Sequence, residues 1–169
     1  LIFCLLFSSY GSTAAGTNNG KMVLVCGDSK VLIVRAEEAG DTIPEVVWEW
    51  DAHQAVDLPD LFRSKKFNSI DDCKAMENGS KILISSSSGA IAIIKRDTRK
   101  VLFYADVPNA HSIEMLPGNI LVAAASTHPD GNRLMVFDLK KAGKLTFTDS
   151  LHSAHGVVWD AKRKSLFAL

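Results

Sequence analysis

Lys21–Arg35 reads KMVLVCGDSKVLIVR, Lys81–Lys95 reads KILISSSSGAIAIIK, and the two segments align without a gap. Each has a Lys, an apolar run, a turn of small residues, and a second apolar run that ends in a basic residue. A third copy, Asn119–Asp138, has the longer turn THPDGN. Short runs rich in Val, Ile and Leu around Gly, Ser, Asp or Asn turns are typical of β-hairpins. The sequence therefore predicts three hairpins.

Additional strand-like segments extend each hairpin. A third strand follows every hairpin, at Glu45–Trp50, Val101–Ala105 and Leu145–Asp149. A strand also precedes the second and third hairpins, and one more pair closes the chain: Ile70–Met76, Ser112–Leu116, Gly156–Asp160 and Ser165–Leu169. The four-strand unit recurs about every 43 residues, a spacing typical of one β-propeller blade.

The predicted fold class is therefore all-β: a β-propeller fragment of four-stranded antiparallel blades, with a little over three blades present. The blades are expected at about 21–50, 69–106 and 112–150, with an incomplete one at 155–169. Residues 21–169 are then the N-terminal part of a single propeller domain. Because closure takes at least four blades, we expect a later segment to supply the innermost strand of the first blade. An open sandwich of short strands is the alternative, although it would not require a gapless repeat.

The first residues resemble an export signal. The apolar run LIFCLLF is followed by small residues, including Ser12 and Ala14, as at a signal cleavage site. The run is too short to cross a bilayer. We interpret residues 1–15 as a secretory signal remnant, which implies a secreted or periplasmic protein with no membrane span after its removal. A buried N-terminal strand is the alternative, and Phe3 argues against lipidation of Cys4.

The composition restricts the function. The 169 residues are 47% hydrophobic and carry 19 basic and 19 acidic side chains. This content fits a folded domain rather than a disordered chain. Zero net charge argues against nucleic acid as a partner, because phosphate neutralisation needs a basic face. Cys26 and Cys73 lie in expected strands and leave two buried thiols or one disulfide as alternatives.

Two family resemblances support the fold. Ala90–Asp106 (AIAIIKRDTRKVLFYAD) resembles the repeat of PQQ-type, quinoprotein-like propellers, in which a strand, an Asp-Thr-Gly-Lys turn and a Trp-bearing strand recur. Arg99 stands where that repeat has Gly, whereas Val46–Ala52 (VVWEWDA) keeps the Trp. Asn109–Ser112 (NAHS) and His155–Asp160 (HGVVWD) are similar to elements of a group of secreted bacterial propellers of unassigned activity. These resemblances imply the fold and no particular chemistry.

The candidate site comes from where the propeller topology places the histidines. All five fall in connections at one face, and the residues that begin innermost strands should converge near the axial mouth. His111 and His155 are the catalytic candidates. The residues predicted to bind a ligand are Asp71, Asp72, His53 and His152. Ties between blades, or solvated loop positions, are the structural alternatives for all of these residues.

Imidazole and carboxylate groups at one opening suit two chemistries. His111, His155 and Asp71 could hold a divalent metal ion, the one cofactor that the sequence suggests. The same groups could act as general acid and base on a sugar. Oligogalacturonate lyases are propellers that resemble this arrangement, with axial histidines around a metal. Two hypotheses follow: a propeller that binds a small polar ligand or glycan, with metal-assisted lyase or hydrolase activity left open, and a non-catalytic platform for protein interaction.

Overall fold

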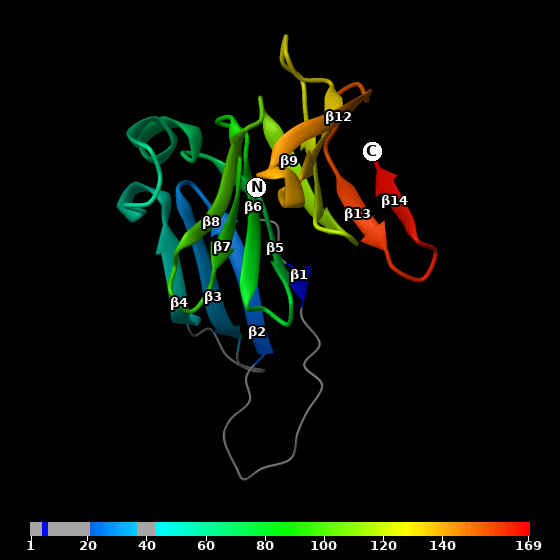
Figure 1. The fold of residues 1–169 in the computed structure, drawn as a ribbon. Coiled ribbons are helices and arrows are strands. Elements are labelled where there is room, and N and C mark those ends of the chain that lie inside the picture. The colour runs from blue at the N-terminus through cyan, green and yellow to red at the C-terminus, as the bar shows by residue number, and fades with distance from the viewer. Residues whose placement is uncertain (1–4, 7–20, 37–42) are drawn as a thin grey trace.

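Three four-stranded sheets and one two-stranded sheet make up the computed structural model, which describes residues 5–6, 21–36 and 43–169 (Figure 1). The first sheet contains β1 (Leu5–Leu6), β2 (Lys21–Gly27), β3 (Lys30–Ala36) and β4 (Glu45–Asp51). The second contains β5 (Ile70–Met76), β6 (Lys81–Ser86), β7 (Ala90–Lys95) and β8 (Val101–Asp106). The third contains β9 (Ala110–Leu116), β10 (Ile120–Ala125), β11 (Arg133–Asp138) and β12 (Lys144–Ser150), and the last pairs β13 (Val157–Asp160) with β14 (Ser165–Ala168).

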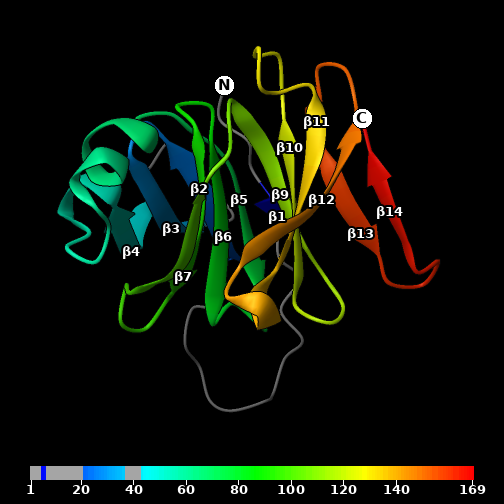
Figure 2. The ribbon, with the colours of Figure 1, turned by 45° about the horizontal axis from the view of Figure 1, so that its top comes forward.

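Every strand pairs antiparallel with its neighbour in the chain, so each sheet is a meander of hairpins. Figure 2 shows the four sheets side by side in chain order, as consecutive blades. The predicted all-β fold of four-stranded antiparallel blades is confirmed. Apolar and turn residues are sufficient to find β2 to β14, and β5 has the predicted bounds Ile70–Met76.

The innermost position of the first sheet is occupied by β1, because Leu5 pairs with Leu24 and Leu6 with Val23. The sequence analysis expected a strand from later in the chain at this position. Apart from Leu5 and Leu6, the predicted signal remnant 1–15 lies outside the described residues.

The connection from β4 to β5 is longer than the other connections between sheets. It contains η1 (Ala52–Gln54), a 3₁₀ turn, and η2 (Phe62–Lys66), a π-helical turn. Phe67 ends this insertion and is fully buried, with its ring edge-on to Trp50 at a centroid distance of 6.3 Å. The insertion is irregular, and it is anchored by the buried aromatic side chain of Phe67. A second 3₁₀ turn, η3 (Leu139–Lys141), precedes β12.

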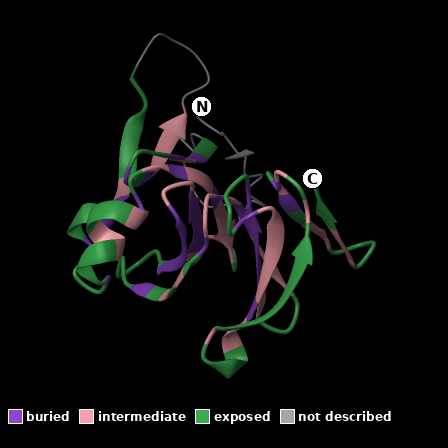
Figure 3. Ribbon diagram, turned by 90° about the horizontal axis from the view of Figure 1, so that it is seen from above, coloured by how far each residue is buried: buried purple, intermediate pink, exposed green. Residues whose placement is uncertain are grey.

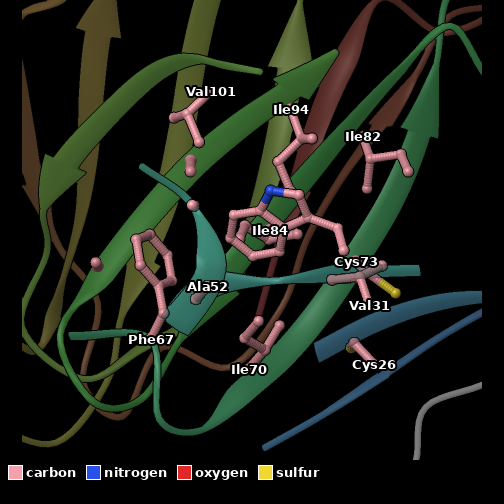
Figure 4. Close-up of a cluster of buried hydrophobic side chains, with 14 of the residues drawn as sticks. Cys26, Val31, Ala52, Phe67, Ile70, Cys73, Ile82, Ile84, Ile94 and Val101 are labelled. Carbon is pink, nitrogen blue, oxygen red and sulfur yellow. The ribbon is translucent and has the colours of Figure 1, made fainter. Parts of the chain in front are cut away.

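The core lies between the sheets, because the middle strands, such as β7 and β10, are apolar on both faces and each face must be covered. Figure 4 shows the cluster between the first two sheets, which includes Val31, Phe67 and Ile84. A second cluster fills the space between the second and third sheets, and a third lies under β13. In Figure 3 the buried residues follow the strands where the sheets face one another. Cys26 is buried in the first cluster with a free thiol, so the thiol alternative holds for it.

Candidate functional site

Two histidines from different sheets meet at one end of the molecule. His111 is the second residue of β9, and His155 comes two residues before β13 begins. Their ring centroids are 4.6 Å apart and the ring planes are inclined by 48°. The structure therefore brings together the two residues that the sequence analysis selected as catalytic candidates.

The polar neighbours of His111 define its hydrogen-bonding state. Its Nε2 lies 3.0 Å from Oδ1 of Asn109, while Nδ2 of Asn109 donates to the carbonyl oxygen of Thr127 at 3.0 Å. An amide oxygen only accepts, so Nε2 of His111 carries the hydrogen. In the neutral ring Nδ1 is then left with an unshared pair that can accept a hydrogen bond.

His155 is oriented by the chain just before it. Its Nδ1 donates to the carbonyl oxygen of Ser153 at 2.5 Å, and Oγ of Ser126 lies 3.4 Å from the same nitrogen. Because a carbonyl oxygen cannot donate, Nδ1 carries the hydrogen and Nε2 of the neutral ring is an acceptor. The two rings together present two acceptor nitrogens beside several hydroxyl groups.

The backbone conformations of Asn109 and Ser153 place these two residues beside the histidine rings. Asn109 and Ser153 both have left-handed backbone conformations, with φ of 47° and 53°. Asn adopts this region more readily than most residues, because its short polar side chain can bond locally. In Figure 2 the β10–β11 and β12–β13 connections stand next to each other at the top of the molecule, and Thr127 donates to Oγ of Ser153 at 3.2 Å between them.

Asp71 belongs to the same neighbourhood because of a β-bulge. Ile70 pairs with Ser86 and Asp72 with Ser85, so Asp71 is left outside the ladder between β5 and β6. Bulges of this kind redirect a side chain. The carboxylate of Asp71 accepts a hydrogen bond from the backbone nitrogen of Ser87 at 2.5 Å, and its charge acts on His111.

Burial lowers the pKa of His111 below the usual 6.5, and the nearby His155 lowers it further, whereas Asp71 raises it in part. His111 is therefore neutral at pH 7, because the charged form is penalised by lost hydration and by a second imidazole. A neutral ring at this point keeps Nδ1 free to accept a hydrogen bond.

The other predicted site residues have different partners. Asp72 accepts a hydrogen bond from Oγ of Ser112 at 2.7 Å and so links the second sheet to the third. His53 lies in η1, where its Nε2 is 2.9 Å from Oδ1 of Asn68. His152 is exposed in the β12–β13 connection. Asp72 therefore fits the structural alternative, a tie between blades, because its hydrogen-bond partner belongs to the neighbouring sheet.

Within the described ranges, no group of three or more His, Cys, Asp or Glu side chains is arranged to hold a metal ion. The set of His111, His155 and Asp71 that was predicted as metal ligands does not form such a group. Nδ1 of His155 is bonded to a carbonyl oxygen, and one carboxylate oxygen of Asp71 accepts from Ser87.

The sequence analysis missed three contributors to this site: Asn109, Ser126 and Ser153. Asn109 could have been found, because it opens the NAHS element and an Asn before a strand is typical of a left-handed turn position. Ser126 is buried at the end of β10 and gives no comparable signal, since small residues in hairpin turns are common.

The larger grooves lie elsewhere. One of about 470 Å³ is bordered by β4, the η1 segment and the β7–β8 turn, including Trp50, Gln54 and Arg99. Another of about 340 Å³ separates the second and third sheets near Phe103 and Gly143. Neither groove is lined by a histidine, so the contact between His111 and His155 lies outside both. No helix in the described part of the chain is long and apolar enough to span a membrane.

Consecutive four-stranded blades with polar residues of three sheets at one mouth define the class of this protein as a β-propeller. The chain belongs to a family described as Family of unknown function (DUF6528), whose model matches residues 15–169. No curated protein matches the sequence.

Among solved structures, the WD40 β-propeller domain of Doa1 is similar, with a TM-score of 0.61 and 14% sequence identity. The likeness covers 87% of this chain and 43% of that chain, so this chain spans less than half the length of the matched structure. At this identity the likeness concerns the fold alone. It supports a propeller and does not single out the quinoprotein-like repeat.

Proposed function

We propose that this protein is a ligand-binding β-propeller that holds a small polyhydroxylated molecule, of the carbohydrate class, at its axial mouth. The observation that carries the proposal is the contact between His111 and His155, each fixed by a neighbour so that one ring nitrogen can accept a hydrogen bond. Serine hydroxyls and the carboxylate of Asp71 supply further acceptors and donors. Sugars present several hydroxyl groups, which both donate and accept hydrogen bonds, so this set of groups suits them.

The neutral state of His111 gives the site a preference. A neutral imidazole accepts from a hydroxyl but offers no charge to an anion. Asp71 adds negative charge near His111. We therefore expect uncharged sugars to bind better than uronic acids.

The same arrangement also suits catalysis in which His155 acts as a general base. Nε2 of His155 has an unshared pair and could take a proton from a bound hydroxyl, as a general base does. The carbonyl oxygen of Ser153, which accepts from Nδ1, holds the ring in the orientation that leaves this nitrogen unshared. We also propose, from the signal-like pattern of residues 1–15, that the protein acts outside the cytoplasm. Cleavage of that signal would remove β1 from its place beside β2.

The test is a binding panel of neutral and uronic-acid oligosaccharides, followed by calorimetry of the best probe with the protein and with His111→Ala and His155→Ala. Each substitution is expected to weaken binding about tenfold, equivalent to about 1.4 kcal/mol. His128→Ala is the matched control, since His128 lies in the β10–β11 connection and its ring accepts from the backbone of Asp130. Its affinity is expected to equal that of the unchanged protein.

Two results would overturn the proposal. One is that no oligosaccharide of the panel binds. The other is that His111→Ala and His155→Ala bind as tightly as His128→Ala. In either case the alternative function, a non-catalytic platform for protein interaction, would be favoured.

A further inference from the structure

A buried charged cluster lies where three sheets meet. Nζ of Lys74, on β5, donates to the carbonyl oxygen of Val157, on β13, at 2.5 Å. The same ammonium is 3.5 Å from Oδ2 of Asp72 and 3.5 Å from Oε2 of Glu114. These three charged side chains are only 16%, 13% and 19% exposed. Because buried charges are costly unless they are paired, so dense a pairing indicates a constrained arrangement.

Ser112 connects this cluster to both neighbouring sheets. Its hydroxyl donates to Oδ2 of Asp72 at 2.7 Å and accepts from the backbone nitrogen of Val157 at 3.3 Å. Nζ of Lys74 approaches the same hydroxyl at 3.3 Å. One buried hydroxyl, 5% exposed, therefore has partners on β5 and β13 while it belongs to β9.

The position of Ser112 in the chain matters for the candidate site. It directly follows His111, and its partner Val157 comes two residues after His155. Each ladder of backbone hydrogen bonds lies within one sheet. The 4.6 Å contact between the two imidazoles crosses from one sheet to the next. The distance between the two rings therefore depends on the side-chain contacts that hold β9 against β13.

We propose that Ser112, held by Asp72 and Lys74, is a positioning residue that sets the separation of His111 and His155 and thereby prepares the axial mouth for its ligand. The part that concerns the ligand rests on the proposed function. The part that concerns the histidines does not, because the geometry of the pair can be measured without a ligand.

The first experiment is Ser112→Ala, with the pKa of both histidines followed by NMR titration of their ring protons. If the rings move apart and admit water, the pKa of His111 is expected to rise by about 0.5 or more toward its usual value. The affinity for the sugar found in the panel is expected to fall about tenfold. A merely structural serine would lower the stability and leave both readouts unchanged.

Ser29→Ala is the matched control. Ser29 is also a buried serine, 6% exposed, and its hydroxyl donates to Oδ1 of Asp51 at 2.8 Å, but both residues belong to the first sheet. This substitution removes the same kind of bond at a similar depth. It is expected to leave the pKa of His111 and His155 as they are.

Asp72→Asn is a second variant in case Ser112→Ala does not fold. Its amide oxygen can still accept from Ser112, without the charge that pairs with Lys74, so a smaller rise in the pKa of His111 is expected. The proposal is overturned if the folded variants titrate like Ser29→Ala. If the histidine pKa moves but no sugar binds to the unchanged protein, the positioning role stands and the proposed ligand class fails.

Discussion

His111 is the side chain whose charge is most closely tied to the shape of the mouth. Burial lowers its pKa most, Asp71 raises the pKa by the next largest amount, and His155 lowers it by a smaller amount. The unfolded chain takes up a proton near pH 6.5, whereas the folded chain resists protonation until the pH is lower. The contribution of a neutral His111 to stability is therefore complete above about pH 6.5 and is lost as the pH falls through the folded-state value.

This linkage predicts a pH-dependent melting temperature. Thermal unfolding of the unchanged protein should move to lower temperature between pH 7.5 and pH 5, and His111→Gln should reduce the shift, because glutamine does not titrate. Melting curves followed by circular dichroism at a series of pH values measure both. Parallel curves for the two proteins would show that His111 has no such role.

Turns of one sheet are fastened to strands of the next. In the β7–β8 turn, Arg99 has a φ of 59°, and its Nε donates to the carbonyl oxygen of Glu49 on β4 at 2.8 Å. Its guanidinium lies 5.8 Å from the centre of the Trp48 ring, and Nε1 of Trp48 donates to the carbonyl oxygen of Arg96 at 2.8 Å. The turn thus keeps at Arg99 a left-handed conformation that Gly adopts without strain, and it gains a contact between sheets.

Two substitutions separate these effects. Arg99→Ala loses the contact and keeps the left-handed strain, so it should lower the free energy of unfolding by about 1–2 kcal/mol. Arg99→Gly loses the same contact but relieves about 1 kcal/mol of strain, so it should be more stable than Arg99→Ala by that amount. Urea denaturation of the three proteins gives the comparison. Equal stability of the Ala and Gly variants would mean that the turn carries no strain.

For the molecule as a whole, the side-chain clusters between sheets supply the stabilisation. Leu83 on β6 is 1% exposed and packs in the cluster with Ile113 and Leu121 of the third sheet. Leu102 lies on β8, the outermost strand of the second sheet, to which Leu83 also belongs, and is 46% exposed. The sheets therefore cohere through buried apolar area, about 25 cal/mol per Å² removed from water.

The prediction compares these two leucines. Leu83→Ala should lower the free energy of unfolding by about 2–5 kcal/mol, because it opens a cavity between two sheets. Leu102→Ala should change it by less than about 1 kcal/mol, as is usual at exposed positions. Chemical denaturation measures both values. Similar losses for the two variants would contradict the view that packing between sheets dominates.

Much of this architecture is predictable from local patterns, and particular residues show where prediction stops. The bounds of β5 follow from its place before the second hairpin, between turn residues. The convergence of His111 and His155 follows from their places at, or just before, the starts of innermost strands. The bulge at Asp71 was not predictable, because it depends on how β5 pairs with β6. The same pairing turns Asp72 toward Ser112, so two adjacent aspartates that look equivalent in the sequence have different partners.

The order of apolar runs and turn residues is enough to specify the hairpins and the four-strand unit, because hairpin formation depends on neighbouring residues. The tertiary structure decides the orientation of each imidazole, the pairing of β1 with β2, and the charged cluster around Lys74. Those features arise from contacts between residues distant in the chain, whose distances depend on how the sheets pack against one another.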